Sequence, residues 1–484
     1  MTDIRAGESA RPHDSDTPLC IDLDGTLIRS DLLLESALGL LRRNPAYVFL
    51  FGVWLLRGKA NLKREIAARI DIDASLLPYE PELLEWLRGQ AAQRRRILCT
   101  ASDAKFAQAV ATHVGGFDEV LASNGKHNLS GANKAETLRQ RFGDRGYDYA
   151  GNAPPDLAVW RHARRGIVVN ASPALARRAG EVVEIERVFA RPTGRGFAWL
   201  RALRLHQWLK NLLVFLPLLA SHRVFDAGAD VQSVLAFISF GLCASGVYLL
   251  NDMLDLEADR NHPRKRLRPF AAGALPLTSG LVAAPLLTIF AFALACFVGP
   301  RFTFVLLGYY LLTLGYSFGI KRIAMLDMVV LAALYTVRIV AGTVAIGAAL
   351  SFWLLAFSMF LFLSLAMVKR YTELHTLLQQ GRNRTGGRDY AVDDLHLIQS
   401  LGGTSGYLAV LVLALYINST ASEALYRHPQ VLWLLCPLLL YWVSRVWLIA
   451  HRGAMHDDPV VFALTDTVSR VVLVLCAAAI VGAI

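Results

Sequence analysis

The stretch VYLLNDMLDLEADRNHPRKRLRPF, residues 247–270, decides how the chain is built. It leaves a long apolar run and presents one amide and three carboxylates, Asn251, Asp252, Asp255 and Asp259, before a run of basic residues. On a helix at 100° per residue, these four side chains fall within an arc of about 100°. The stretch therefore predicts a charged site at the end of a membrane-spanning helix.

Composition separates two kinds of sequence around this stretch. The chain has 484 residues, of which 54% are hydrophobic, and its mean hydropathy is +0.39. Residues before about 190 mix charged and apolar types, whereas long apolar runs follow from about 205. We expect a disordered tail at 1–18, a soluble domain at 19–190, a linker at 191–205 and a polytopic membrane domain at 206–484. No signal peptide is visible, and the six scattered cysteines predict buried free thiols.

The apolar runs predict about nine membrane helices, by the criterion of about 20 apolar residues per crossing. The expected spans are 207–222, 231–251, 283–300, 303–320, 325–348, 352–368, 402–420, 430–450 and 463–484. A further apolar run at 45–57 is too short to cross a membrane. It predicts either a buried helix or a helix on the membrane surface.

Basic residues predict the orientation in the membrane. They gather in the loops after the second, fourth and sixth spans, as at Arg264, Lys321 and Lys369. The positive-inside bias places these loops and the soluble domain in the cytoplasm, and an odd number of spans places the C-terminus outside. We expect a multi-pass protein of the cell (inner) membrane. The net charge of +11 then indicates contact with anionic membrane lipids rather than with nucleic acid.

The clustered carboxylates predict a bound cation, because they repel one another unless a positive charge lies among them. Hard divalent ions prefer oxygen ligands, and Mg²⁺ commonly bridges carboxylates to phosphates. The alternative is a solvated acidic helix end. A second acidic stretch, GRDYAVDDL, places Asp389, Asp393 and Asp394 on another loop of the same predicted side. Together, the two sets indicate a site for one diphosphate.

NDMLDLEAD resembles the N-D-x-x-D-x-x-x-D motif of the UbiA-type prenyltransferase superfamily, whose members have nine membrane helices and a second acidic loop. The resemblance covers roughly residues 200–484. It implies that Mg²⁺ and a diphosphate are bound by the following residues: Asn251, Asp252, Asp255, Asp259, Asp389, Asp393 and Asp394. Asp252 and Asp255 are the expected catalytic pair.

Three further stretches, QWLKN, LDMVVLA and SLAMVKRYTEL, look like the polyprenyl-phosphate phosphoribosyltransferase branch of this superfamily. That resemblance implies 5-phosphoribosyl diphosphate as donor and a polyprenyl phosphate lipid as acceptor. The candidate substrate-binding residues are Gln207, Lys210, Asn211, Tyr248, Lys321, Arg322, Tyr335, Arg338, Lys369, Arg370 and Tyr390. Arg338 lies inside an apolar run, so it should face a polar cavity or pair with an acid such as Asp327 or Asp466.

The soluble part carries a second motif. TPLCIDLDGTLIRSD resembles the D-x-D-G-T motif of haloacid-dehalogenase-like phosphohydrolases. The resemblance implies a three-layer α/β fold with a helical cap at about 32–90. It also implies that Asp22 is the nucleophile and Asp24 the general acid and base, that Thr100 and Lys134 hold the phosphoryl group, and that the metal ligands are Asp22, Asp24, Asn152 and Asp156.

One position departs from the phosphohydrolase pattern. Asn152 stands where the family usually has an aspartate that binds Mg²⁺, so the site has less negative charge. The soluble domain is therefore either an active phosphatase or a degenerate scaffold.

The sequence predicts a bifunctional enzyme that adds 5-phosphoribose to a polyprenyl phosphate and then removes the 5-phosphate. One alternative is an aromatic prenyltransferase that uses a polyprenyl diphosphate and has a degenerate phosphatase domain. The other is a transporter or lipid-binding scaffold, for which the Asp252 and Asp255 carboxylates would be dispensable. The sequence is compatible with an oligomer.

Overall fold

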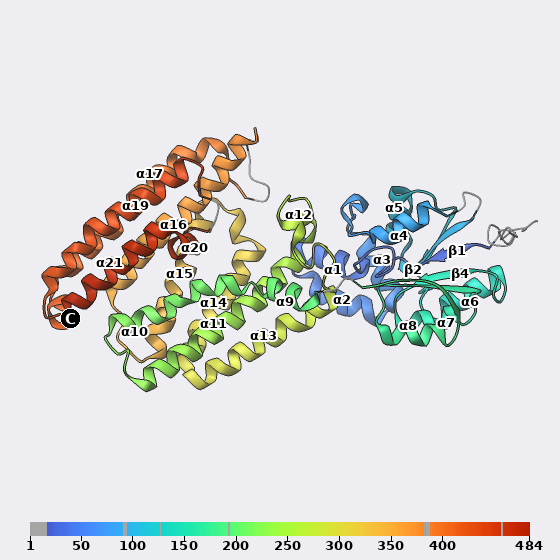
Figure 1. Cartoon of the computed structure of the whole chain (residues 1–484), viewed down its shortest axis with the longest axis horizontal. Helices are drawn as coiled ribbons and strands as arrows, with labels where there is room; N and C mark the ends of the chain where they lie inside the picture. The colour runs from blue at the N-terminus through green and yellow to red at the C-terminus, as the bar shows by residue number, and fades with distance from the viewer. Residues whose placement is uncertain are drawn as a thin grey trace, which may run out of the picture. The chain divides into compact units, whose positions relative to one another are not determined.

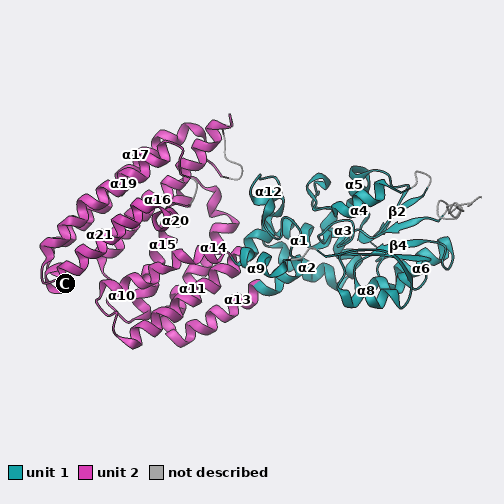
Figure 2. Ribbon diagram, in the orientation of Figure 1, with its two compact units in different colours: residues 1–203, 249–283 teal, residues 204–248, 284–484 magenta. Residues whose placement is uncertain are grey.

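The computed structural model describes residues 17–90, 94–125, 127–191, 194–381, 383, 388–455 and 458–484. Residues 1–16, most of the predicted disordered tail, lie outside this description. The chain forms two compact units (Figure 2). Unit 1 comprises residues 1–203 and 249–283, and unit 2 comprises residues 204–248 and 284–484. The acidic stretch of the motif at 251–259 therefore belongs to unit 1.

Unit 1 contains a parallel six-stranded sheet. Its strands are β1 (Leu19–Ile21), β2 (Arg96–Asp103), β3 (Glu119–Ser123), β4 (Asp148–Gly151), β5 (Arg165–Val169) and β6 (Glu184–Phe189). Their order across the sheet is β3-β2-β1-β4-β5-β6. The direction of winding reverses between β1 and β4, and the crevice beyond the carboxyl ends of strands at such a point is the usual ligand site of this architecture.

Helices cover both faces of the sheet (Figure 1). They are α5 (Ala104–Val114) on one face and α6 (Ala132–Phe142), α7 (Leu157–Trp160) and α8 (Pro173–Gly180) on the other. The alternation of β1 explains both layers, because Ile21 packs with Phe106 of α5, whereas Cys20 packs with Leu138 of α6. The predicted three-layer α/β fold is confirmed.

The segment between β1 and β2 is helical where it is described. It contains α1 (Leu32–Arg43), α2 (Tyr47–Leu56), α3 (Lys59–Ala67), η1 (Ala74–Leu76) and α4 (Pro81–Arg88), in the place of the predicted cap. The predicted linker contains a further helix, α9 (Arg195–Leu203). Helix α2 matches the short apolar run at 45–57, but most of its side chains are exposed, which excludes the buried-helix alternative.

The remaining elements are long apolar helices joined by short ones. They are η3 (Leu205–Phe215), α10 (Leu216–Ala220), α11 (Ala227–Leu254), α12 (Leu256–Arg260), η4 (Lys265–Leu267), α13 (Leu277–Val298), α14 (Pro300–Phe318), η5 (Ile320–Arg322), α15 (Leu326–Ala345), α16 (Phe352–Gln379), η6 (Val392–Asp394), α17 (Leu395–Ile417), α18 (Thr420–Leu425), η7 (Pro429–Leu434), α19 (Leu435–His451), α20 (Pro459–Thr465) and α21 (Thr467–Ala483).

Among the described residues, six helices are long and apolar enough to cross a membrane, and a seventh span results if α20 and α21, bent by 78°, are counted together. The chain is therefore a multi-pass membrane protein. The difference from the nine spans expected lies in two segments. The run at 207–222 is broken into η3 and α10, and α14 is not among the described helices that meet the criterion.

The 3₁₀ segment η3 brings polar residues into unit 2. The Trp208 indole donates to the Ser245 hydroxyl at 3.0 Å. Gly342 of α15 lets the segment approach closely, since a Cβ at that position would lie 2.0 Å from the Val214 carbonyl oxygen. As a result, Lys210 and Asn211 are buried rather than exposed to lipid.

Candidate active sites

The first candidate site lies where the sheet reverses its winding. Asp22 directly follows β1, and its Oδ1 accepts a hydrogen bond from Lys134 Nζ at 2.7 Å. Lys134, in the first turn of α6, also donates to the Tyr149 hydroxyl of β4 at 2.9 Å. Three elements distant in sequence thus bring the predicted nucleophile and its predicted cation together.

The second carboxylate of the motif is held by other donors. Asp24 accepts from the Leu32 amide at 2.8 Å and from the Ser102 hydroxyl at 2.6 Å, and Thr100 Oγ1 lies 3.4 Å away. The turn that follows Asp24 requires glycine. Gly25 has φ +75°, and a Cβ there would lie 1.9 Å from Asn152 Nδ2. The side-chain amide of Asn152 therefore packs directly against Gly25 of the D-x-D-G-T motif.

Burial sets the protonation of this site. It raises the pKa of Asp22 to about 6, and the Lys134 ammonium acts in the opposite direction. Burial, with Asp31 nearby, raises the pKa of Asp24 to about 7. The pKa of Lys134 lies above its ordinary value, because Asp22 and Asp156 outweigh its burial. An ammonium beside one carboxylate and a protonatable second carboxylate suit phosphoryl transfer followed by proton transfer.

Asp156 forms hydrogen bonds that hold the loop after β4. Its carboxylate accepts from the backbone amides of Asn152 and Ala153, both at 2.9 Å, and from the Tyr149 hydroxyl at 2.8 Å. These contacts fix the loop that presents Asn152. The structure therefore gives Asp156 a positioning contact, while its expected role as a metal ligand stays a prediction.

Two polar residues near this site were missed from the sequence. Ser102 makes the shortest hydrogen bond to Asp24. Its position two residues after Thr100 on β2 places both side chains on the same face of the strand, and this spacing could have identified it from the sequence. Lys63 of α3 donates to the Ala101 carbonyl at 2.5 Å and to Asn128 Oδ1 at 2.8 Å. No pattern in the sequence distinguishes Lys63 from other basic residues of a surface helix.

The acidic stretch at 251–259 carries the second candidate site. The helix predicted through it is interrupted, since α11 ends at Leu254 and α12 begins at Leu256. Asp252 and Asp259 are nevertheless brought together, because Arg268 Nη1 lies 3.2 Å from Asp252 Oδ1 and 2.7 Å from Asp259 Oδ2. Asp255 Oδ1 lies 3.4 Å from Arg42 Nε of α1.

The neighbouring carboxylates of this stretch are therefore paired with guanidinium groups. Both Asp252 and Asp259 are buried, and Asn251 is half-buried. Carboxylates this close together repel one another unless a cation lies among them. Asn251 and the three aspartates would coordinate a metal through oxygen atoms, which are the ligands that a hard divalent ion prefers. Among the described residues, no three His, Cys, Asp or Glu side chains form a ready metal cluster.

The second acidic stretch differs. Asp389 and Asp393 are exposed. Asp394 precedes α17, but its Oδ2 accepts from the Ala391 amide at 2.9 Å, so this carboxylate stabilises the start of the 3₁₀ segment η6 instead. Its three aspartates remain predicted metal ligands.

Unit 2 holds a cluster of cations around a carboxylate that the sequence did not single out. Asp458 Oδ2 accepts from Lys210 Nζ at 2.7 Å and from Lys369 Nζ at 3.0 Å. The Tyr335 hydroxyl lies 3.2 Å from Asp458 Oδ1. Asp458 precedes Pro459 at the start of α20, which is typical of an N-cap residue but gives no signal of these long-range partners.

Arg338 faces the same polar interior. Its Nε donates to Asn211 Oδ1 at 2.9 Å and its Nη2 to the Tyr309 hydroxyl at 3.1 Å. The guanidinium carbon lies 5.7 Å from the centre of the Tyr335 ring, whose other close cation is Lys210 at 5.6 Å. Asn211 Nδ2 is buried and has no hydrogen-bond partner among the described residues.

The two acids considered as partners of Arg338 pair elsewhere. Asp327 accepts from Arg370 Nε at 2.6 Å and from the Tyr390 hydroxyl, and Asp466 accepts from Arg445 at 2.6 Å. Arg370 also donates to Glu373 at 2.6 Å. Two predicted substrate-binding residues, Arg370 and Tyr390, therefore belong to an internal ion-pair network.

The other predicted substrate-binding residues differ in exposure. Gln207, Tyr248 and Lys321 are half-buried, and Arg322 is exposed. The Arg204 guanidinium lies over the Tyr248 ring, 5.1 Å from its centre.

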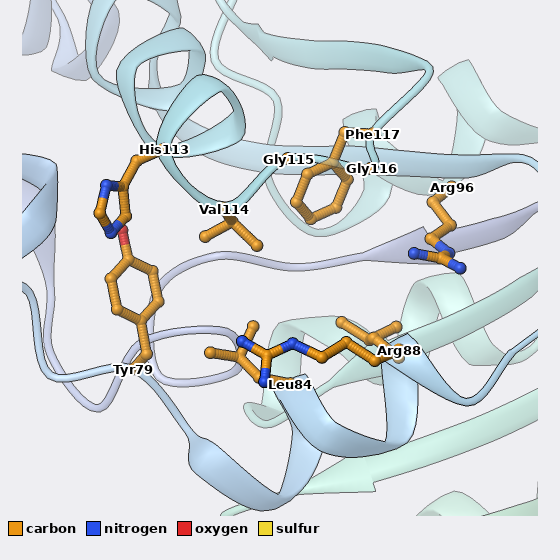
Figure 3. Close-up of a pocket in the computed structure, with 10 residues that line it drawn as sticks. Tyr79, Leu84, Arg88, Arg96, His113, Val114, Gly115, Gly116 and Phe117 are labelled. Carbon is orange, nitrogen blue, oxygen red and sulfur yellow. The ribbon is translucent and has the colours of Figure 1, made fainter.

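A cavity of about 320 Å³ opens elsewhere in unit 1 (Figure 3). Tyr79, Arg88, Arg96 and His113 contribute to its walls, and it is lined by none of the motif residues. It is therefore separate from the chemistry described above.

Comparison with known proteins agrees with the membrane part of this description. Residues 212–468 match the UbiA prenyltransferase family. An uncharacterized protein of Sinorhizobium fredii is 35% identical over 474 residues, which cover 97% of this chain and 92% of that protein. A decaprenyl-phosphate phosphoribosyltransferase of Mycobacterium tuberculosis is 36% identical over 210 residues, 42% of this chain and 70% of that protein.

A solved structure of a UbiA homolog from Archaeoglobus fulgidus, bound to GPP and Mg²⁺, is 16% identical and has a TM-score of 0.46, covering 58% of this chain and 99% of that chain. The family match includes more than half of the chain, and it contains Asp252, Asp255, Arg338 and Lys369, whereas Lys210 lies two residues before it. The chain belongs to the UbiA prenyltransferase family.

Proposed function

We propose that the chain transfers 5-phosphoribose from 5-phosphoribosyl diphosphate to a polyprenyl phosphate, and that its α/β site then removes the 5-phosphate to give polyprenyl-phosphoryl ribose. Similarity to a decaprenyl-phosphate phosphoribosyltransferase supports the choice of donor and acceptor. We place the activity in the cell membrane, with the α/β part in the cytoplasm, on the distribution of basic loops.

The observation that carries the proposal is the cation cluster of unit 2. Lys210, Lys369 and Arg338 gather near one carboxylate, Asp458. The hydrogen-bonding partners of Arg338 among the described residues are neutral groups, and Asn211 Nδ2 is an unused donor. Lys210 and Arg338 are buried, and cations in excess over carboxylates favour anionic ligands. Phosphate groups on both donor and acceptor meet that requirement, whereas an aromatic acceptor does not.

In the proposed transfer, an oxygen of the lipid phosphate attacks the anomeric carbon of ribose, and the bond to the diphosphate breaks. The lipid phosphate is already an anion at neutral pH, so the chain needs no general base for this step. Lys210 and Lys369 would orient phosphate oxygens. Asn251, Asp252, Asp255, Asp259 and the aspartates of the second stretch would hold Mg²⁺, which supplies positive charge to the departing diphosphate.

In the proposed second step, Asp22 attacks phosphorus, and the ribose 5-oxygen leaves with a proton from Asp24. Lys134 would hold the phosphoryl oxygens, and water would then release inorganic phosphate from Asp22. The site supports these roles because Asp22 contacts Lys134, while burial keeps Asp24 able to carry a proton. Covalent linkage of the two activities raises the local concentration of the second for the product of the first.

The test uses the full chain in vesicles with Mg²⁺ and polyprenyl phosphate. One set of reactions receives 5-phosphoribosyl diphosphate labelled in the ribose, and a parallel set receives a labelled prenyl diphosphate with an aromatic acceptor. We expect label in the lipid fraction only from the ribosyl donor. Transfer of the prenyl group instead would establish the aromatic prenyltransferase, and activity with neither donor would contradict both.

The phosphatase step is tested with Asp22→Asn, which keeps the shape of the nucleophile but removes its charge. This variant should accumulate the 5-phosphorylated lipid while total lipid labelling stays unchanged. Asp144→Asn, at an exposed aspartate of the same unit, is the matched control. Dephosphorylated product from Asp22→Asn at the wild-type rate would remove the α/β site from the proposal.

A further inference from the structure

Helix α2 of unit 1 presents an apolar surface that no other part of the described chain covers. Phe49 and Leu56 are 79% and 89% exposed. The other exposed apolar side chains of this helix are Val48, Leu50, Val53 and Leu55. Contiguous exposed apolar surface of this kind marks a contact with another molecule or with a membrane.

The opposite side of α2 fixes the helix to the protein. Trp54 is buried in the core, and Tyr47 and Phe51 pack against that core and against the Trp54 ring, with ring centres 6.1 and 5.8 Å away. The exposed side is therefore not the result of a loosely attached segment. An ordinary surface helix would carry polar residues there.

Contacts inside unit 1 place the start of α2 near the end of a membrane span. Helix α1 ends four residues before α2 begins. Its Glu35 forms a bidentate ion pair with Arg260 of α12, at 2.8 and 2.6 Å, and its Arg42 contacts Asp255. Asp255 directly follows Leu254, the last residue of the candidate span α11.

The flanking charges and the length identify the partner. The exposed residues Arg43, Arg57 and Lys59 border the apolar side chains, and cations at this place are attracted to anionic lipid headgroups. Ten residues of helix extend about 15 Å, half of the roughly 30 Å needed to cross the hydrocarbon core. A short apolar helix with basic flanks at the foot of a span is suited to lie within the membrane surface.

We propose that α2 is seated in the surface of the same bilayer that α11 crosses, with its exposed apolar side chains among the acyl chains and its flanking basic residues on anionic headgroups. This contact does not depend on the reaction proposed above.

One consequence rests on the proposed function. Helix α3 follows α2 after two residues and carries Lys63, which binds the Ala101 carbonyl between Thr100 and Ser102. With α2 in the bilayer surface, the phosphatase site would therefore be held close to the phosphate group of a membrane lipid.

The direct test reconstitutes the full chain in vesicles of phosphatidylcholine and phosphatidylglycerol that contain a phospholipid with a diazirine in its acyl chain. After irradiation and trypsin digestion, lipid adducts are located by mass spectrometry. We expect adducts on the peptide 44–57, between Arg43 and Arg57, and on peptides of the membrane spans. The peptide 166–177, which includes part of α8, should carry none.

The matched variants are Phe49→Glu with Leu56→Glu, and Val188→Glu as control, since Val188 is a 54% exposed apolar residue of unit 1 outside α2. The double variant should lose the adducts on 44–57, and the control should keep them. Absence of adducts on wild-type 44–57, with the spans labelled, would overturn the proposal. Intermolecular cross-links between Lys59 residues, in place of lipid adducts, would assign the surface to a second copy of the chain.

The consequence for catalysis has its own measurement. The double variant should hydrolyse a vesicle-borne ribose 5-phosphate lipid at least about tenfold more slowly, because the site is no longer held at the surface, and should hydrolyse p-nitrophenyl phosphate at the wild-type rate. Equal loss with both substrates would overturn the coupling. If the wild type lacks phosphatase activity, the proposed second step fails, while the lipid adducts still decide the membrane contact.

Discussion

The carboxylates after β1 and those at the end of α11 both lie in unit 1, but they are neutralised in different ways. Asp22 and Asp24 are held by donors from separate elements, with Lys134 and Ser102 at 2.7 and 2.6 Å. Asp252 and Asp259 instead both contact the guanidinium of Arg268, whose side chain is 27% exposed. The donors of the first site are buried side chains, whereas the second site includes a partly exposed arginine at its edge.

This difference suggests different responses to ligands. Moving Asp22 or Asp24 would break hydrogen bonds of buried groups, so the phosphatase site should change little when substrate enters. An arginine at the edge of the second site can swing into solvent at small energetic cost when a divalent ion takes its place. We infer a preformed first site and a second site that exchanges one cation for another.

Removing a carboxylate from the second site should have the largest effect. Asp252→Asn keeps the size of a buried side chain but removes the charge that the proposed Mg²⁺ requires. We expect the rate of lipid labelling to fall by about 10³-fold, equivalent to about 4 kcal/mol. Asp230→Asn, near the other end of the same helix α11, is the matched control and should retain activity. Full activity of Asp252→Asn would exclude this site from the transfer.

Lys134→Met tests the fixed contacts of the first site. It leaves Asp22 buried without its cation, so dephosphorylation should fall by about 10²-fold and the free energy of unfolding of unit 1 should fall by about 3 kcal/mol. Lipid labelling should persist. Rate measurements on both steps and a thermal melt check these outcomes. Lys105→Met is the control, because it loses an ion pair with the exposed Asp71 and hydrogen bonds to two carbonyl groups but no contact with Asp22. An equal loss there would show that the effect is not specific to Asp22.

Sequence patterns predicted the first site more completely than the second, for a physical reason. Asp22 follows β1, Thr100 lies towards the end of β2 and Lys134 lies in the first turn of α6, and the order of these elements in a parallel α/β fold brings the three together, so local motifs imply contact. In unit 2, Lys210 and Lys369 were found through the stretches QWLKN and SLAMVKRYTEL, but their partner Asp458 was not, because helix packing alone brings it to them. Long-range pairs between helices leave no local pattern.

The same limit explains two further differences. Arg370 was expected to bind substrate, yet it lies beside Asp327 and Glu373, and such a pairing depends on how α15 packs against α16. Arg268 was one of several equivalent basic residues in the run after Asp259. Only the turn between α12 and α13 selects it to contact Asp252 and Asp259.

Arg268→Gln tests the proposed exchange of cations. Without Mg²⁺, Asp252 and Asp259 would repel each other, and the melting temperature should fall, corresponding to a loss of about 1–2 kcal/mol. Addition of Mg²⁺ should restore more stability to this variant than to the wild type. Thermal melts with and without Mg²⁺ measure the difference, with Arg266→Gln as control. A loss that Mg²⁺ does not reduce would mean that Arg268 has a structural role unrelated to the ion.

Asn152→Asp should give the smallest effect. It adds a carboxylate to the first site, which then has more negative charge, as the second site does. The Asn152 amide lies over Gly25, next to the turn that carries Asp22 and Asp24. A carboxylate there adds negative charge, so the Mg²⁺ concentration for half-maximal dephosphorylation should fall by about tenfold. Asn133→Asp, on the exposed start of α6, is the matched control. Because Asp156 fixes the loop through backbone amides that the substitution leaves in place, the variant should fold normally. An unchanged Mg²⁺ requirement would show that residue 152 does not approach the ion, and that the asparagine is tolerated because the ligands lie elsewhere.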